Sequence, residues 1–235
     1  MDYISSRGQS PAVDSAQAVL SGLAPDGGLY MPRAIPAFDW QHCLTLSAQQ
    51  MSAAILSALL PDIPNMDALV KRAYTGKFET EDLTPTVPVG DFQVLELFRG
   101  PTSAFKDVAL SMLPQLLTAA KREKGIAQEI RILTATSGDT GKAALVGFRD
   151  VPGVRICVFY PYGGVSQVQR AQMVTQEGNN VVLTLTLDTD RLSEDPLGNG
   201  DGYFQFTAGT GCTGVADNGP YFRLQLRITN PLFDD

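Results

Sequence analysis

The sequence predicts an α/β protein, with a doubly wound and mostly parallel sheet, an amino-terminal helical cap and a β-rich carboxyl-terminal tail. Three observations support this class. Apolar residues recur at helical spacing before about residue 85. Strand-like and helical stretches then alternate with short connections, which is typical of parallel sheets. After about residue 182, apolar and polar residues alternate one by one, as in half-buried strands.

The helical cap is predicted from capping and stop signals. Asp14 and Gln17 have the spacing of a capping box, which predicts a short helix ending near Gly22. A second helix carries its apolar residues on one side and ends at Pro61, because proline cannot continue a helix. The second helix and the one after it are expected over residues 47–60 and 67–74.

The middle of the chain is predicted to form the parallel sheet and its crossover helices. In such sheets, ligands bind at the carboxyl ends of the strands. The expected strands are residues 92–98, 130–135, 154–160 and 181–187, and the expected helices pass through 113–117, through 145 and over 165–176.

The composition changes near residue 182. The segment 183–235 holds eight acidic and three basic residues, and no lysine follows Lys142. Alternation over 222–229 favours antiparallel β structure there. We therefore divide the chain into a helical cap (1–85), an α/β domain (86–182) and a β-rich tail of unknown origin (183–235).

Composition and charge bound the function. The chain has 235 residues, 44% hydrophobic, enough for a buried core, and its net charge of -7 argues against nucleic acid or an anionic membrane as partner. Three scattered cysteines without a C-x-x-C pair indicate neither disulfides nor zinc, and the single histidine, His42, predicts no metal site or hydrolase triad. No signal peptide or apolar stretch of membrane-spanning length is present, so we expect a cytoplasmic protein.

One candidate for chemistry is Lys106, in the stretch Leu97-Phe98-Arg99-Gly100-Pro101-Thr102-Ser103-Ala104-Phe105-Lys106-Asp107. Lys106 is predicted at the mouth of a helix, against the apolar ring of Phe105. Such surroundings disfavour the charged amine and suit a lysine that attacks a carbonyl group. The alternative is a solvated lysine in a helix-initiating loop.

The second candidate is the stretch Leu133-Thr134-Ala135-Thr136-Ser137-Gly138-Asp139-Thr140-Gly141-Lys142-Ala143-Ala144. It leads from a strand through small residues into a helix, where backbone amides and the helix dipole favour a carboxylate or phosphate. It is neither G-x-G-x-x-G nor a Walker A loop, so no nucleotide is predicted. The alternative is an ordinary strand-to-helix turn with Asp139 as its cap.

Together, these two stretches resemble the signatures of threonine synthase, G-P-T-x-A-F-K-D and A-T-S-G-D-T-G-x-A-A. This family uses pyridoxal 5′-phosphate and has the fold of the tryptophan synthase β chain. Three more segments are similar in family order, at residues 3–8, 22–32 and 160–173. The resemblance covers about residues 1–182, and nothing after Leu183 matches.

The resemblance implies a carbon–oxygen lyase that converts O-phospho-L-homoserine and water to L-threonine and phosphate. It implies that Lys106 holds the cofactor and moves protons, and that Phe105 and Asp139 lie against the cofactor. The substrate-binding residues that it implies are Ser137, Gly138, Asp139, Thr140, Gly141, Ser166 and Gln169.

The sequence also departs from the family pattern. Arg99 replaces a histidine, Gly164 replaces a basic residue, and Pro114 falls inside the helix after Lys106. The competing hypothesis is therefore a non-catalytic α/β binding domain that keeps the synthase architecture. An exposed edge after the last parallel strand would favour self-association in either case.

Overall fold

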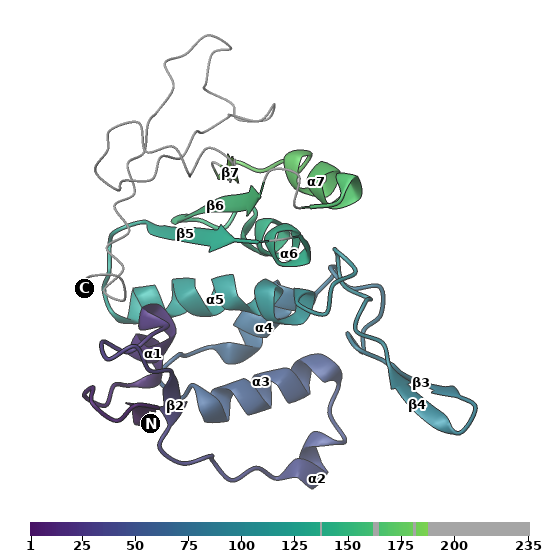
Figure 1. Cartoon of the computed structure of the whole chain (residues 1–235). Helices are drawn as coiled ribbons and strands as arrows, with labels where there is room; N and C mark the ends of the chain where they lie inside the picture. The colour runs from purple at the N-terminus through teal and green to yellow at the C-terminus, as the bar shows by residue number, and fades with distance from the viewer. Residues whose placement is uncertain (137, 162–164, 181, 188–235) are drawn as a thin grey trace, which may run out of the picture. The chain divides into compact units, whose positions relative to one another are not determined.

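The computed structural model describes residues 1–136, 138–161, 165–180 and 182–187 (Figure 1). The chain divides into two compact units, residues 1–129 and 130–235. The divisions expected at residues 85 and 182 stay predictions. Within the described part, no helix is long and apolar enough to cross a membrane.

The first unit begins with a small antiparallel pair and a capped helix. Strand β1 (Tyr3–Ser5) pairs with β2 (Tyr30–Pro32), and α1 (Ser15–Ser21) lies between them in sequence. The Asp14 carboxylate accepts a hydrogen bond from the Gln17 amide at 2.8 Å. The helix ends at Gly22, so the predicted start and stop of this helix are both confirmed.

Three helices follow, namely α2 (Trp40–Cys43), α3 (Ala48–Leu59) and α4 (Met66–Tyr74). A reciprocal capping box between Ser47 and Gln50 opens α3, which ends just before Pro61 as expected. Both predicted helices are confirmed. The hydrophobic core of the first unit is built from α1, α3, α4 and α5; its most buried members include Ala16, Ala53, Leu69, Val70, Ala73 and Ala120.

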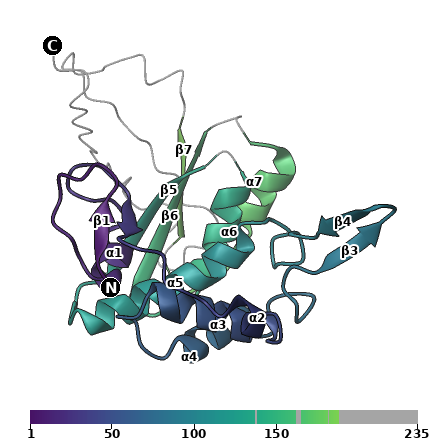
Figure 2. The same ribbon diagram turned by 90° about the horizontal axis from the view of Figure 1, so that it is seen from below.

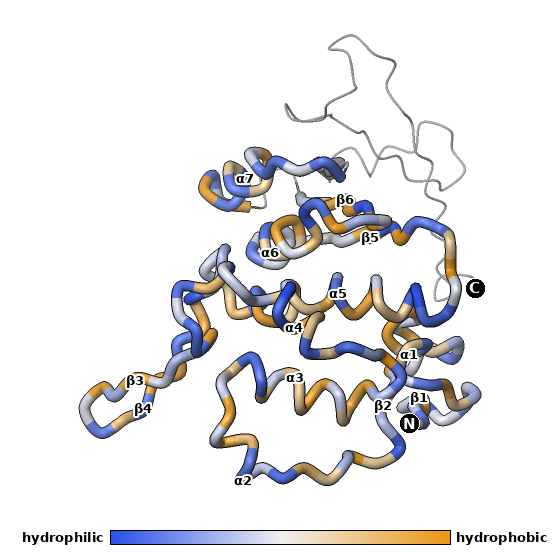
Figure 3. The backbone as a smooth tube through the Cα atoms, turned by 180° about the vertical axis from the view of Figure 1, so that it is seen from behind, coloured by the Kyte–Doolittle hydropathy of each residue, from blue (hydrophilic) through white to orange (hydrophobic). Residues whose placement is uncertain are grey.

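Helix α5 (Asp107–Glu123) is the longest in the described part and packs against α1 and α4. Hydrophobic and hydrophilic residues alternate along its tube in Figure 3, as amphipathic packing requires. The helix continues through Pro114, which is buried. Proline removes one backbone hydrogen bond, and burial of the surrounding apolar face offsets this cost.

The strand expected over 92–98 is not part of the parallel sheet. Strand β4 (Phe92–Leu95) pairs antiparallel with β3 (Thr86–Val89), with Val89 opposite Phe92. The two residues between them, Gly90 and Asp91, form the turn, and Gly90 has a φ of 59° that favours glycine. This hairpin extends away from the helices of the first unit (Figures 1 and 2).

The second unit contains the parallel sheet, in the order β5 (Ile130–Ala135), β6 (Val154–Pro161) and β7 (Val182–Leu187). Helices α6 (Asp139–Phe148) and α7 (Gln167–Val174) connect the strands and lie beside each other on one side of the sheet (Figure 2). The α/β class and the parallel pairing are therefore confirmed here. The expected β structure after residue 187 lies outside the described residues.

Candidate functional site

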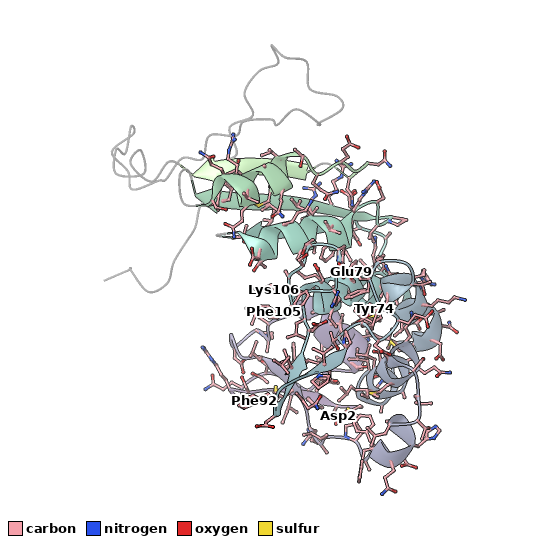
Figure 4. The ribbon with its side chains drawn as sticks, turned by 90° about the vertical axis from the view of Figure 1, so that its right-hand side faces the viewer. Asp2, Tyr74, Glu79, Phe92, Phe105 and Lys106 are labelled. Atoms are coloured by element: carbon pink, nitrogen blue, oxygen red, sulfur yellow. The ribbon has the colours of Figure 1, made fainter. Side chains whose placement is uncertain are left out.

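Lys106 lies immediately before the first residue of α5. Its Nζ atom lies 4.4 Å from the centroid of the Phe105 ring. Both side chains are labelled in Figure 4. Lys106 is half-buried, whereas Phe105 is 63% exposed. The expected contact between the lysine and the aromatic ring is present, but the exposed ring attracts a cation and is not the apolar surrounding that was expected to disfavour the charged amine.

The loop before Lys106 is held by a residue that sequence reasoning missed. The Asp107 carboxylate accepts hydrogen bonds from the Thr102 amide at 2.8 Å and the Thr102 hydroxyl at 2.6 Å. Gly100 lies so close that a Cβ atom added there would come within 2.5 Å of Asp107. The signal was available in the motif, because threonine and aspartate five residues apart can close a loop before a helix.

Arg99, the residue that departs from the family pattern, binds two carboxylates of its own unit. Its guanidinium lies 2.9 Å from Glu79 and 2.6 Å from Glu96, and it stacks 5.0 Å from the centre of the Phe98 ring. These hydrogen bonds, the one to Glu79 first, raise the pKa of Arg99. Arg99 therefore links the segment after the hairpin to the loop that holds Glu79.

The glycine turn of the second unit is organised around Thr136. The Thr136 hydroxyl accepts hydrogen bonds from the amides of Gly138 at 3.1 Å and Gly141 at 3.0 Å, and its own amide donates to the Phe159 carbonyl. Gly141 has no room for a side chain, since a Cβ atom would lie 2.3 Å from the Thr136 methyl carbon. The turn thus connects the end of β5 to the start of α6.

Helix α7 reaches this turn through Gln169. The side-chain amide nitrogen of Gln169 donates a hydrogen bond to the Asp139 carboxylate at 2.9 Å. The same side chain also lies close to Gly138. Ser166 and Gln169 form the capping box that opens α7. Four of the implied site residues (Gly138, Asp139, Ser166 and Gln169) therefore come together within the second unit.

The start of α6 has the physical properties of an anion-binding turn. The helix dipole places partial positive charge at the start of a helix, although the amides of Gly138 and Gly141 already donate here to the Thr136 hydroxyl. Thr140 and Gly141 fall within this first turn, and Lys142 follows. Burial, together with the nearby charge of Arg149, lowers the pKa of Lys142, whose amine donates to Gln176 at 2.7 Å.

The structure thus places the implied residues in two groups. Lys106 and Phe105 belong to the first unit, and Gly138 to Gly141 with Ser166 and Gln169 belong to the second. Ser137 lies outside the described residues. Thr102, Asp107 and Thr136 complete the local geometry of each group, although sequence reasoning assigned them no role.

Comparison with known proteins shows which family this α/β chain is similar to. A family model described as the threonine synthase N terminus matches residues 2–74. Threonine synthase of Methylobacillus glycogenes is 38% identical over 195 residues, which cover 77% of this chain and 41% of the relative. The enzyme of Saccharomyces cerevisiae is 38% identical over 199 residues, covering 76% and 38%.

Solved structures give the same result. The PLP-bound threonine synthase of Brucella melitensis superposes with a TM-score of 0.71 at 37% identity, covering 78% of this chain and 41% of that one. Threonine synthase of Escherichia coli gives 0.66 at 34% identity, covering 80% and 43%. Over the matched region, the chain is related to the amino-terminal part of threonine synthases. It spans about two fifths of the length of the relatives it matches.

Proposed function

We propose that this chain supplies the lysine and the anion-binding turn of a PLP-dependent threonine synthase, which converts O-phospho-L-homoserine and water to L-threonine and phosphate. A cytoplasmic location and a small-molecule substrate belong to the same proposal. One observation carries it: Lys106 lies at the start of α5, in a loop closed by Asp107, within a chain 37% identical to a PLP-bound threonine synthase.

The residues of the first unit fit the attachment of the cofactor. Reaction with a carbonyl group is favoured when the primary amine is held in a fixed position. The Lys106 backbone is fixed by its position between a closed loop and a helix. Phe105 offers an exposed ring beside this amine. When bound, pyridoxal phosphate supplies an electron sink for carbanion chemistry.

The chain's own residues then perform binding and proton transfer. The Lys106 amine takes and returns protons at Nζ, as a general base and acid. The turn from Gly138 to Gly141 receives the substrate carboxylate at the positive end of α6. Gln169 links this turn to α7 through its hydrogen bond to Asp139, and Ser166 holds Gln169 through the capping box of α7.

The test is phosphate release. The purified chain is incubated with pyridoxal phosphate and O-phospho-L-homoserine, and phosphate and threonine are measured together with the variants Lys106→Ala and Lys71→Ala. Lys71 is an exposed lysine of α4 and serves as the matched control. We expect equal amounts of both products from wild type and Lys71→Ala, and none from Lys106→Ala. Product formation equal in all three, or absent from the wild type, contradicts the proposal.

A further inference from the structure

Asp107 is a buried carboxylate whose two oxygens both accept hydrogen bonds from one neighbouring residue. It is 2% exposed, and Oδ2 and Oδ1 accept from the amide and the hydroxyl of Thr102, respectively. Among the described residues, no cationic side chain lies within ion-pair distance of it. Burying a carboxylate is costly unless hydrogen bonds satisfy it, so these two bonds to Thr102 are what keep it in place.

The two bonds join Thr102 to Asp107 and so close a loop of four residues, 103–106. We call residues 102–107, the loop with its two bonded ends, the 102–107 loop. The loop is tight: the Ser103 amide donates to the Gly100 carbonyl at 3.1 Å, and Ser103 has a φ of 57°, which is uncommon for a residue other than glycine. Gly100 closes the other side, since a Cβ atom there would overlap Asp107. Strain of this kind persists only where the surrounding bonds hold it.

Lys106 is the last residue of this loop and directly precedes Asp107. Its carbonyl already accepts from the Leu110 amide in the first turn of α5. The backbone of Lys106 is therefore fixed on one side by the helix and on the other by the bonds of Asp107. The direction in which the lysine side chain leaves the backbone depends on both constraints.

We propose that Asp107 is a positioning residue, which acts through Thr102 to fix the direction of the Lys106 side chain. This inference rests on the proposed function, because it gives the lysine its reactive orientation toward a carbonyl group. Displacing a reacting group by about 1 Å costs up to about 100-fold in rate, so loss of the loop closure has a large kinetic effect.

Thr102 allows the role to be separated from folding. Thr102→Val removes the hydroxyl donor but keeps the amide donor and the side-chain shape, and Thr102→Ser restores the hydroxyl. Asp107→Asn leaves only one side-chain oxygen to accept hydrogen bonds from the two Thr102 donors, the amide and the hydroxyl. The matched control is Thr118→Val in α5, the helix that Asp107 begins. This change removes the hydrogen bond of 2.8 Å that the Thr118 hydroxyl donates to the Pro114 carbonyl, far from the loop.

Two measurements on the full chain give independent readouts. The first is competitive acetylation of the lysines without cofactor, in which the rate at Lys106 is compared with that at exposed Lys71 at one fixed pH. The second is the rate at which pyridoxal phosphate becomes fixed on Lys106 when borohydride is added at intervals. Unfolding by urea is followed for every variant, so that a loss of stability is recorded separately.

We expect Thr102→Val and Asp107→Asn to change the acetylation rate of Lys106 relative to that of Lys71 and to slow cofactor fixation at least about tenfold. Thr102→Ser and Thr118→Val should retain the wild-type rates. If Thr102→Val and Asp107→Asn lower stability while both lysine readouts match the wild type, Asp107 has a structural role only and the inference is overturned. Absence of cofactor on Lys106 of the wild type would instead refute the proposed function, since the acetylation rates are measured without cofactor.

Discussion

The side-chain amide nitrogen of Gln169 donates a hydrogen bond to the Asp139 carboxylate at 2.9 Å. A residue of α7 thereby fixes the first residue of α6. The oxygen of the same amide accepts from the Ser166 backbone at 3.2 Å, so both ends of the Gln169 side chain are engaged. This arrangement makes Gln169 a link between the two helices of the second unit.

Gln169→Glu should weaken this link. The new carboxylate cannot donate to Asp139 and repels it, and we expect the free energy of unfolding to fall by about 1 kcal/mol at neutral pH. Protonation restores a donor, so the loss should shrink below pH ~4. Urea unfolding at pH 7 and pH 4 measures this. The control Gln167→Glu, an exposed position in the same turn, should have little effect, and an equal loss there would contradict the assignment.

Gly141→Ala should destabilise the turn between β5 and α6. The added carbon would lie 2.3 Å from the Thr136 methyl carbon, 3.0 Å from the Met173 sulfur and 3.1 Å from Val158. Overpacking of this kind costs about 1–3 kcal/mol. Gly178→Ala is the matched control, because its nearest neighbour would be 3.4 Å away. Similar thermal midpoints for the two variants would refute the close packing.

Asp26 should govern part of the acid sensitivity of the first unit. Hydrogen bonds, the one from Ser5 first and then those from the Gly28 and Gln9 amides, lower the pKa of Asp26 from 3.8 to about 2. A lowered pKa adds stability above the unfolded value, and this stability is lost as the pH falls from about 4 to about 2. Urea midpoints across this range should fall less steeply in Asp26→Asn; identical slopes would contradict the shift.

The hairpin and the core should respond differently to truncation. Leu69 is 2% exposed within the core of the first unit, and Leu69→Ala should cost about 2–5 kcal/mol. Phe92 on β4 is 75% exposed, so Phe92→Ser should change the free energy of unfolding by less than about 0.5 kcal/mol. Urea unfolding compares the two. A large loss for Phe92→Ser would mean that another surface covers the hairpin.

Local signals were enough to predict α1, α3 and α4, whereas the four-residue helix α2 was not predicted. Asp14 and Ser47 are helix caps whose hydrogen bonds form within three residues of the chain. Pro61 ends a helix because proline has no backbone N–H to donate. The prediction of a parallel-sheet strand over 92–98 is wrong, because β4 ends at Leu95 and pairs antiparallel with β3. Strand partners are set by distant packing, and the two-residue Gly90–Asp91 turn was the only local sign of an antiparallel partner.

The sequence motifs predicted which residues belong to the candidate site, but not all of the hydrogen bonds between their side chains. The sequence placed Lys106 beside Phe105 and at a helix start, and both relationships are present. The bonds of Asp107 to Thr102 and of Gln169 to Asp139 were not foreseen, because side-chain pairing depends on the folded backbone. A polar residue that closes a loop has the same sequence pattern as one that binds a ligand.

The most direct test of the account is the position at which pyridoxal phosphate becomes attached. The chain is incubated with the cofactor, reduced with borohydride, digested and mapped by mass spectrometry. The account predicts one modified peptide that contains Lys106, and no such adduct in Lys106→Ala. An adduct spread over other lysines, such as exposed Lys71, or no adduct at all, would contradict the claim that the amine of Lys106 is the attachment point.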